Sequence, residues 1–458
     1  MTKYDAIIIG TGQAGPSLAG RLVAAGRKVA IIERKAFGGT CVNTGCIPTK
    51  TLVASAYAAY LARNAAAFGV RIRGDIIVDM KAVKARKDAV AGTSRSGLES
   101  WLRSLAGCTV YDGHARFVSP RQVAVADQLL EAEHIFINVG GRASAPPIVG
   151  LNEVDYLTNS SIMEIDFLPR HLIVVGGSYI GLEFAQIYRR FGAQVTVVEL
   201  APRLIAREDT DVSMAVADVL RGEGVDVRVD AKQLRVAKAG SDIIADFVCE
   251  RGQAKIVGSH LLLAVGRRPN TDDLGLDKAG VAVDARGYIQ VDDQLRTSVP
   301  GIWALGDCNG RGAFTHTSYN DFDIAAANLL DNDPRRVTDR ITAYNLYIDP
   351  PLGRAGLTEA EVRASGRRAL IAKMPMERVG RAFEKGETRG FMKILVDRKS
   401  ELILGASLLG IGADEVIHTL LDLMYAKASY RVLQRAMHIH PTVSELLPTM
   451  MNQLQPLQ

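Results

Sequence analysis

Two short runs of branched apolar residues, each ending in glycine, dominate the hydrophobic pattern of this chain. Ile7–Ile9 stands before Gly10, and Ile173–Val175 stands before Gly176. Continuous apolar runs of this length are typical of strands buried on both faces in a parallel sheet. We therefore predict strands over residues 6–9 and 172–175, followed by helices over residues 18–25 and 182–191.

The two units are copies of one another, separated by a constant offset of 166 positions from Gly10 to Gly176. The same offset relates three further pairs: Gly15 and Gly181, Gly26 and Gly192, and Glu33 and Glu199. One glycine-rich turn is a weak signal. Two complete strand–turn–helix–strand units in register are a strong signal for two dinucleotide-binding units.

Each unit contains the groups that a dinucleotide needs. Gly10, Gly12 and Gly15 permit a tight turn, close approach of the pyrophosphate and close packing of the helix. The helix N-terminus attracts phosphate, and Glu33 is placed to accept hydrogen bonds from a ribose. Ser178 replaces the middle glycine in the second unit, where we expect a modest change in pyrophosphate approach. The alternative, two ordinary turns without a nucleotide, requires both glycine sets and both acids to coincide.

Two dinucleotide sites in one chain indicate FAD and a nicotinamide cofactor. Glu199 favours NADH, because a carboxylate at this place repels the 2′-phosphate of NADPH. Arg203 and Arg207 follow a few residues later and reduce the strength of this preference.

The composition limits the class of protein. A length of 458 residues predicts about three domains, and 48% hydrophobic with 23% charged residues is typical of a globular chain. The net charge of +5 comes from scattered basic residues, so we expect no nucleic-acid partner. The sequence contains no run of about 18 apolar residues and no signal peptide, so we expect no membrane span and a cytoplasmic location.

Cys41 and Cys46 are the cysteines that carry a prediction. The count of five cysteines is odd and differs from a secreted disulfide framework. In a regular helix their Cα atoms would lie about 8–9 Å apart, beyond the roughly 4.4–6.8 Å of a disulfide. The pair bridges only if the segment is irregular, which Gly45 and Pro48 permit. Pro48 also suits the first turn of a helix, whose N-terminus would stabilise a Cys46 thiolate.

Three interpretations of this pair are open, and a redox-active disulfide beside the flavin is the one we favour. A zinc site is disfavoured by the spacing and by the lack of a second Cys/His pair at hand. Two free buried thiols are the simplest alternative. We make no prediction for Cys108, Cys249, Cys308 or His316.

The run from Gly39 to Lys50, Gly-Thr-Cys-Val-Asn-Thr-Gly-Cys-Ile-Pro-Thr-Lys, resembles the signature of the class I pyridine nucleotide–disulfide oxidoreductases. This family includes glutathione reductase, lipoamide dehydrogenase and mercuric reductase, and the likeness extends over essentially the whole chain. Residues 297–307 resemble the second flavin motif, which assigns ribitol binding to Asp307. Residues 264–270, with Gly266, resemble the segment that closes the nicotinamide domain.

The resemblance assigns further residues around the cofactors. Lys50 and Glu183 match the ion pair beside the reactive edge of the flavin. Tyr179 matches the ring that gates the nicotinamide pocket. We also place Ala115 among the cofactor-binding residues.

Near the C-terminus, His440 stands directly before Pro441, and Glu445 follows five residues after the histidine. The resemblance makes His440 the general acid–base and Glu445 the residue that orients it, a role that suits the near-neutral pKa of imidazole. Thr442 and Glu445 also form a capping box, so a structural role for Glu445 is the alternative. His438 matches nothing in the family and is expected to be structural.

In the family this histidine comes from the partner subunit, so the resemblance implies an obligate homodimer. The strand pattern over 390–409 and the amphipathic pattern over 414–427 fit an interface domain. We predict an α/β fold with two Rossmann-like dinucleotide-binding domains and an α+β C-terminal dimerisation domain. The FAD domain would span 1–148 and 271–338, the NAD(P) domain 149–270, and the interface domain 339–458.

The resemblance implies that electrons pass from NADH through FAD to the Cys41–Cys46 disulfide. Cys46 would be the flavin-side thiol, Cys41 the thiol that attacks the substrate, and His440 the proton donor to the leaving thiol. A small disulfide is the favoured substrate, with lipoamide as an alternative. Mercuric ion is disfavoured because residues 446–458 hold no cysteine pair. A flavoprotein NADH oxidase or a structural flavin-binding protein with a vestigial disulfide is the alternative from another class.

Overall fold

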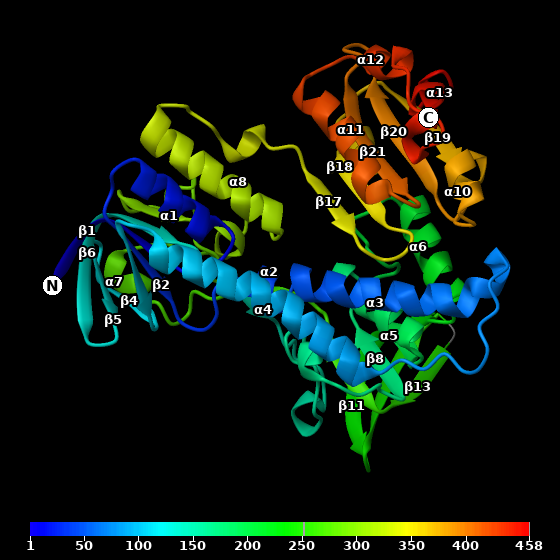
Figure 1. Cartoon of the computed structure of the whole chain (residues 1–458), viewed down its shortest axis with the longest axis horizontal. Helices are drawn as coiled ribbons and strands as arrows, with labels where there is room; N and C mark the ends of the chain where they lie inside the picture. Colours follow the sequence, from blue (N-terminus) through cyan, green and yellow to red (C-terminus); the bar gives the residue numbers. More distant parts are fainter. Residues whose placement is uncertain (251, 458) are drawn as a thin grey trace.

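The computed structural model describes residues 1–250 and 252–457, and it contains three sheet-based units (Figure 1). The first unit has a seven-stranded sheet of order β3-β2-β1-β6-β5-β4, with β16 paired to β6. Its strands are β1 (Thr2–Ile9), β2 (Val29–Glu33), β3 (Cys108–Asp112), β4 (Ala115–Ser119), β5 (Gln122–Val125), β6 (Gln128–Ile137) and β16 (Ile302–Ala304). Strands β1, β2, β3, β6 and β16 run parallel, and α1 (Ala14–Ala24) packs beside α8 (Thr315–Ala326).

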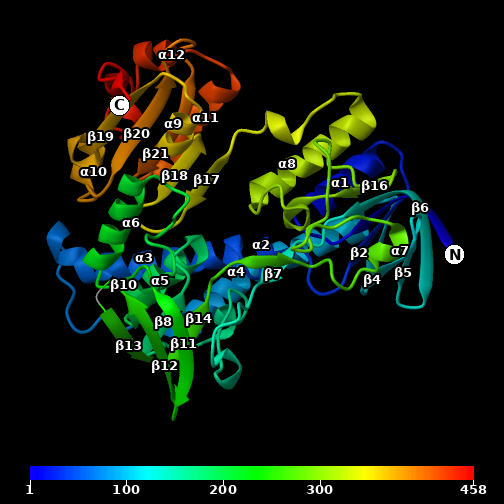
Figure 2. The ribbon, with the colours of Figure 1, turned by 180° about the vertical axis from the view of Figure 1, so that it is seen from behind.

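The second unit repeats this design on a smaller scale. Its parallel sheet has the order β10-β9-β8-β14, formed by β8 (His171–Val175), β9 (Gln194–Val198), β10 (Asp226–Arg228) and β14 (His260–Leu263). The helices are α5 (Tyr179–Phe191) and α6 (Thr210–Gly222). An antiparallel sheet of β11 (Lys232–Ala239), β12 (Asp242–Cys249) and β13 (Gly252–Gly258) adjoins it, and Figure 2 shows this sheet clearly from behind.

The third unit is an antiparallel sheet of order β17-β18-β21-β20-β19-β22. Its strands are β17 (Ala343–Leu346), β18 (Leu352–Gly356), β19 (Ala369–Pro375), β20 (Phe391–Asp397), β21 (Ile403–Leu409) and β22 (Gln455–Pro456). Its helices are α9 (Glu359–Ala364), α10 (Gly380–Glu384), α11 (Ala413–Tyr425), α12 (Tyr430–Arg435) and α13 (Leu447–Met451). The predicted fold class is confirmed: two nucleotide-type units built on parallel strands, the first with the antiparallel β4 and β5 at its edge, and one α+β unit.

The units are joined by elements that pack across their boundaries. A short ribbon of β7 (Gly141–Ala143) and β15 (Arg267–Pro269) connects the first two units. The long helix α3 (Cys46–Asn64) packs on α5 of the second unit, and α4 (Met80–Ser104) extends from there to β3 of the first unit (Figure 1). The third sheet is attached to the second unit by Lys393, which is 1% exposed and contacts Asp209 and Asp211 at 2.8 Å.

Two helices begin earlier than the sequence pattern predicted. Helix α1 begins at Ala14 rather than Leu18, and α5 begins at Tyr179 rather than Leu182. The prediction started each helix at its first regularly spaced apolar residue. The glycine-containing first turns lack that pattern but are already helical, because they pack directly on the strand before them.

No helix in the described part of the chain combines the length and apolar character of a membrane span.

Candidate functional site

The 166-residue repeat extends to the hydrogen bonds that hold the two acidic residues. Glu33 accepts from the backbone N–H groups of Thr11 and Lys35 at 3.0 and 2.9 Å. Glu199 accepts from the backbone N–H groups of Gly177 and Ala201 at 2.5 and 2.7 Å, each 166 positions further on. Both carboxylates are therefore fixed at the mouth of a glycine turn, where a ribose would lie.

The glycine turns are too close to their neighbours for any side chain. A Cβ at Gly10 would lie 2.4 Å from the Asn138 carbonyl oxygen, and one at Gly176 would lie 2.4 Å from that of Ala264. The side-chain nitrogen of Asn138 is buried beside the first turn and has no partner among the described residues. These close backbone approaches and the unused donor fit a dinucleotide in each turn. Ser178, at the middle position of the second turn, is exposed and causes no clash.

The two cysteines lie on either side of a helix break. Helix α2 (Gly39–Asn43) contains Cys41, and Cys46 is the first residue of α3. Thr44 and Gly45 between them are non-helical, with Gly45 at φ −134° and ψ −121°. A Cβ at Gly45 would lie 2.8 Å from the Thr40 carbonyl oxygen, so only glycine fits this bend. The predicted irregular segment and the helix start at Cys46 are both confirmed.

The sulfur atoms occupy different electrostatic environments. The hydrogen bond from Cys41 lowers the pKa of Cys46 to about 6, helped by Thr315 and Lys50 and opposed by burial. The same hydrogen bond and burial raise the pKa of Cys41 far above its ordinary value. The Sγ of Cys46 lies 3.1 Å from the hydroxyl of Thr315 at the start of α8. Of the two sulfurs, Cys46 is thus the one whose surroundings favour the thiolate form.

An ion pair and an aromatic group lie next to these sulfurs. Lys50, on α3, donates to both carboxylate oxygens of Glu183 at 2.9 and 2.7 Å. The Glu183 side chain is 7% exposed and also accepts from the Tyr347 backbone at 3.0 Å. Tyr179, the first residue of α5, packs its ring edge-on against Phe314, the residue before Thr315. The structure therefore brings these predicted residues together around the cysteine pair.

Three further predicted residues lie in the first unit or at its junction with the second. Asp307 is 3.6 Å from Arg267, and burial raises the pKa of its carboxyl group. Gly266 has a φ of +124°, and its carbonyl accepts from Ser144 at 3.0 Å. Ala115 is 2% exposed at the start of β4. It stands two residues after Gly113, which bonds the Glu33 carbonyl, so this strand begins beside the first nucleotide turn.

The predicted acid–base pair lies elsewhere in the chain. His440 and Glu445 are joined by a 2.7 Å hydrogen bond, and the His440 side chain is 78% exposed. The same Glu445 oxygen accepts from the Thr442 backbone at 3.4 Å, so the capping box and the contact with His440 coexist. His438 bonds the Ser444 carbonyl. Helices α12 and α13, which flank this segment, lie at the far end of the third unit from the start of α3 (Figures 1 and 2).

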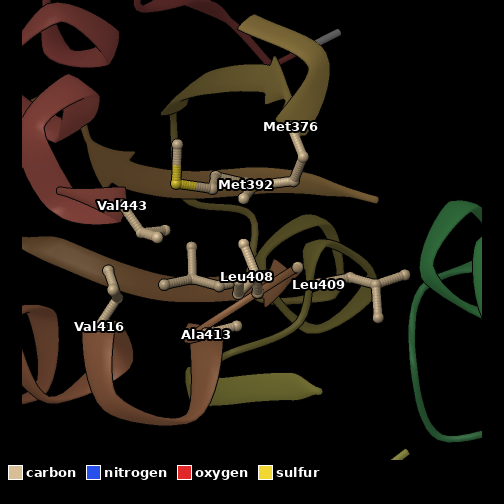
Figure 3. Close-up of a pocket in the computed structure, with 9 residues that line it drawn as sticks. Met376, Met392, Leu408, Leu409, Ala413, Val416 and Val443 are labelled. Atoms are coloured by element: carbon tan, nitrogen blue, oxygen red, sulfur yellow. The ribbon is translucent and has the colours of Figure 1, made fainter. Parts of the chain in front are cut away.

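A small apolar pocket in the third unit is a separate feature (Figure 3). Its labelled side chains are those of Met376, Met392, Leu408, Leu409, Ala413, Val416 and Val443. None of them is ionisable or nucleophilic, and several belong to the hydrophobic core of this unit. The pocket is a packing feature of the third sheet.

Two family models match the chain. Residues 4–321 match "Pyridine nucleotide-disulphide oxidoreductase", and residues 342–451 match the dimerisation domain of the same proteins. The chain belongs to the class I pyridine nucleotide–disulfide oxidoreductases. It is an FAD-dependent enzyme that acts on sulfur groups with a nicotinamide cofactor, NAD(P)H, as the other partner.

Several named proteins are similar over nearly the whole chain. The probable pyridine nucleotide-disulfide oxidoreductase RclA of Escherichia coli (strain K12) is 36% identical, with 98% of each chain covered. A mercuric reductase of Streptomyces lividans is 34% identical (97% and 95% covered), and a dihydrolipoyl dehydrogenase of Thermus scotoductus is 32% identical (97% and 96%). A structure of E. coli RclA, titled a HOCl-induced flavoprotein disulfide reductase, matches with a TM-score of 0.89 and 35% identity, covering 98% and 99% of the chains.

Sequence reasoning missed three residues of the site: Phe314, Thr315 and Tyr344. None of these three residues belongs to a recognised motif. Thr315 reaches Cys46 across 269 positions, and the Tyr344 and Tyr179 rings lie 5.3 Å apart. The only local signal was the position of Phe314 and Thr315 shortly after the Asp307 motif.

Proposed function

We propose that this enzyme reduces a small disulfide with electrons from NADH through a Cys41–Cys46 redox disulfide. The observation that carries the proposal is the Cys46 sulfur at the start of α3, which lies across the helix break from Cys41 and 3.1 Å from the Thr315 hydroxyl. A pKa near 6 makes this sulfur a thiolate at neutral pH, the form required for sulfur exchange.

The two glycine turns with Glu33, Asp307 and Glu199 would hold the dinucleotides. FAD, when bound, supplies the two-electron relay between the nicotinamide and the disulfide. The reduced pair then consists of a Cys46 thiolate and a Cys41 thiol.

Substrate reduction follows from thiol–disulfide exchange. His440 removes the Cys41 proton, which the raised pKa of Cys41 makes necessary. The Cys41 sulfur attacks the substrate disulfide, a mixed disulfide forms, and the first leaving thiolate takes the proton from His440. The Cys46 thiolate then attacks Cys41, which releases the second thiolate and re-forms the Cys41–Cys46 bond.

We further propose that His440 acts on the dithiol of a partner subunit in a homodimer. The dimerisation-domain match over residues 342–451 supports this assembly. Two neighbours of the histidine are strongly exposed, Met437 at 97% and Ile439 at 78%, as expected for an interface that the single chain leaves open.

A mixing experiment tests the shared site. Cys41→Ser and His440→Gln homodimers are each expected to be inactive. In a hybrid dimer one site combines an intact dithiol with an intact histidine of the other subunit, so random subunit exchange should restore about a quarter of wild-type activity. No restored activity in dimers shown to be mixed means that the histidine serves its own chain.

NADH is the proposed electron donor. Glu199 keeps its carboxylate at the second turn, and Arg203 is directed back to its own loop, where it donates to the Ala206 and Glu208 carbonyls at 3.0 and 3.3 Å. The carboxylate therefore repels a 2′-phosphate without compensation from Arg203. We expect kcat/KM for NADH to exceed that for NADPH by about tenfold or more. Equal values contradict this assignment.

A panel of substrates identifies which disulfide the enzyme reduces. Lipoamide, glutathione disulfide and other low-molecular-weight disulfides are compared, each with NADH. Mercuric ion and Cu(II) are included because one relative is named a mercuric reductase and one RclA structure is titled a Cu(II) complex. Turnover of a disulfide that is lost in Cys46→Ser supports the proposal. NADH consumption by oxygen alone, unchanged in Cys46→Ser, indicates the oxidase alternative.

A further inference from the structure

The ring of Tyr179 rests on an aromatic wall formed by two residues from other elements. Phe314 and Tyr344 are stacked at 5.4 Å with an interplanar angle of 14°. Tyr179 meets both of them edge-on, at 6.1 Å from Phe314 and 5.3 Å from Tyr344. The position of this wall therefore determines where the Tyr179 ring comes to rest.

Ring packing is the contact that holds Tyr179 in this place. Its hydroxyl oxygen is buried and has no hydrogen-bond partner in the described part of the chain. A buried hydroxyl without a partner is unfavourable, while edge-to-face contacts are modestly favourable. The two effects oppose each other, so a small movement of the wall changes how readily the ring leaves it.

A buried carboxylate fixes the wall. The Tyr344 hydroxyl donates to Glu208 Oε1 at 2.5 Å, and the Glu208 side chain is completely buried. Arg354 lies 3.9 Å from the other oxygen. That oxygen and one Arg354 nitrogen have no hydrogen-bond partner among residues 1–250 and 252–457. Among the described residues, the Tyr344 hydroxyl is thus the group that hydrogen-bonds this carboxylate. The bond joins the second unit to β17 of the third unit.

The loop that carries Glu208 is also bound to the second glycine turn. The Ile205 N–H donates to the Gly177 carbonyl at 2.8 Å. Ile205 has a φ of +39°, a conformation that a β-branched residue rarely adopts without support. The cradle for the dinucleotide and the wall behind Tyr179 are therefore connected by one constrained loop.

We propose that the Glu208–Tyr344 hydrogen bond is a positioning device for Tyr179: it fixes the resting place of the gate ring and sets how readily the nicotinamide reaches the flavin. The inference rests on the proposed function and on the role of gate to the nicotinamide pocket that the family resemblance assigns to Tyr179. Glu208 and Tyr344 act through Tyr179 and are positioning residues.

Tyr344→Phe in the FAD-loaded enzyme tests the proposal, because it keeps the ring and removes the anchor. Anaerobic stopped-flow mixing with NADH gives the half-saturating concentration and the limiting rate of flavin reduction. The loosened wall should release Tyr179 more easily, so the half-saturating concentration should fall about fivefold with the limiting rate within about twofold. Glu208→Gln keeps an acceptor for Tyr344 and should remain within about twofold of the wild type on both measures.

Tyr425→Phe is the matched control, because its hydroxyl accepts from Ile341 in the third unit and should not alter NADH saturation. An unchanged or raised half-saturating concentration in Tyr344→Phe overturns the proposal, even if the melting temperature falls. If NADH does not reduce the wild-type flavin, the proposed function and this inference both fail. Normal wild-type reduction with no shift in the variant refutes the positioning role alone.

Discussion

Replacing Thr315 with valine should raise the pKa of Cys46. The threonine hydroxyl lies 3.1 Å from the Cys46 sulfur and is one of the groups that lower its pKa to about 6. A hydrogen bond to a charged group contributes about 1.5–3 kcal/mol. Thr315 is only one of the groups that lower this pKa, beside Cys41 and Lys50, so the lower end of that range applies. Because one pKa unit corresponds to about 1.4 kcal/mol, we expect a rise of about one unit, to about 7.

The sign of this effect is fixed by the charge on the sulfur. The hydroxyl donates to the thiolate and stabilises it, so its removal favours the protonated thiol and moves the titration to higher pH. The assay is the long-wavelength thiolate-to-flavin absorbance of the two-electron-reduced enzyme, followed anaerobically against pH.

Thr317→Val is the matched control, because the Thr317 hydroxyl bonds the backbone of Phe314 in the same helix start and should leave the midpoint in place. A Thr315→Val midpoint that stays at the wild-type pH, or equal shifts in both variants, refutes the reasoning.

Three further changes probe the site. Lys50→Met leaves the Glu183 carboxylate, 7% exposed, without its cation and should lower the free energy of unfolding by about 2 kcal/mol, as measured by denaturant titration. Adding Glu183→Gln should recover part of this loss. If the effects of the two substitutions simply add, the two residues are not coupled. His440→Gln should lower disulfide turnover by about 10²–10⁴-fold without slowing NADH-dependent flavin reduction; if flavin reduction slows equally, the histidine is not the proton donor to substrate. Glu445→Gln should lower turnover by about 10–100-fold, whereas Thr442→Ala should lower the melting temperature with little effect on turnover. If Thr442→Ala lowers turnover and Glu445→Gln lowers only the melting temperature, Glu445 serves the cap alone.

Glu445 shows why two interpretations of one motif need not exclude each other. The sequence offered either a capping box or an orienting carboxylate. In the structure one oxygen of Glu445 serves the Thr442 backbone at 3.4 Å and His440 at 2.7 Å. The short turn after Pro441 allows both contacts, because the histidine and the helix start lie within the same few residues.

The sequence by itself determined the features that depend on local chain geometry. The 166-residue repeat predicted two nucleotide turns, and the same offset recurs in the backbone bonds of Glu33 and Glu199. The spacing of Cys41 and Cys46 predicted a broken helix, and the break occurs at Thr44 and Gly45. These features follow from glycine conformation and helix pitch, which act over a few residues.

Only the tertiary structure decided which distant side chains surround those features. Thr315 meets Cys46 across 269 positions, and Tyr344 meets Glu208 across 136. Both contacts depend on how α8 and β17 pack against units formed by other parts of the chain. A hydroxyl carries no periodic pattern that reveals its partner, so burial and the packing of three sheets, rather than local spacing, place Thr315 and Tyr344 at the site.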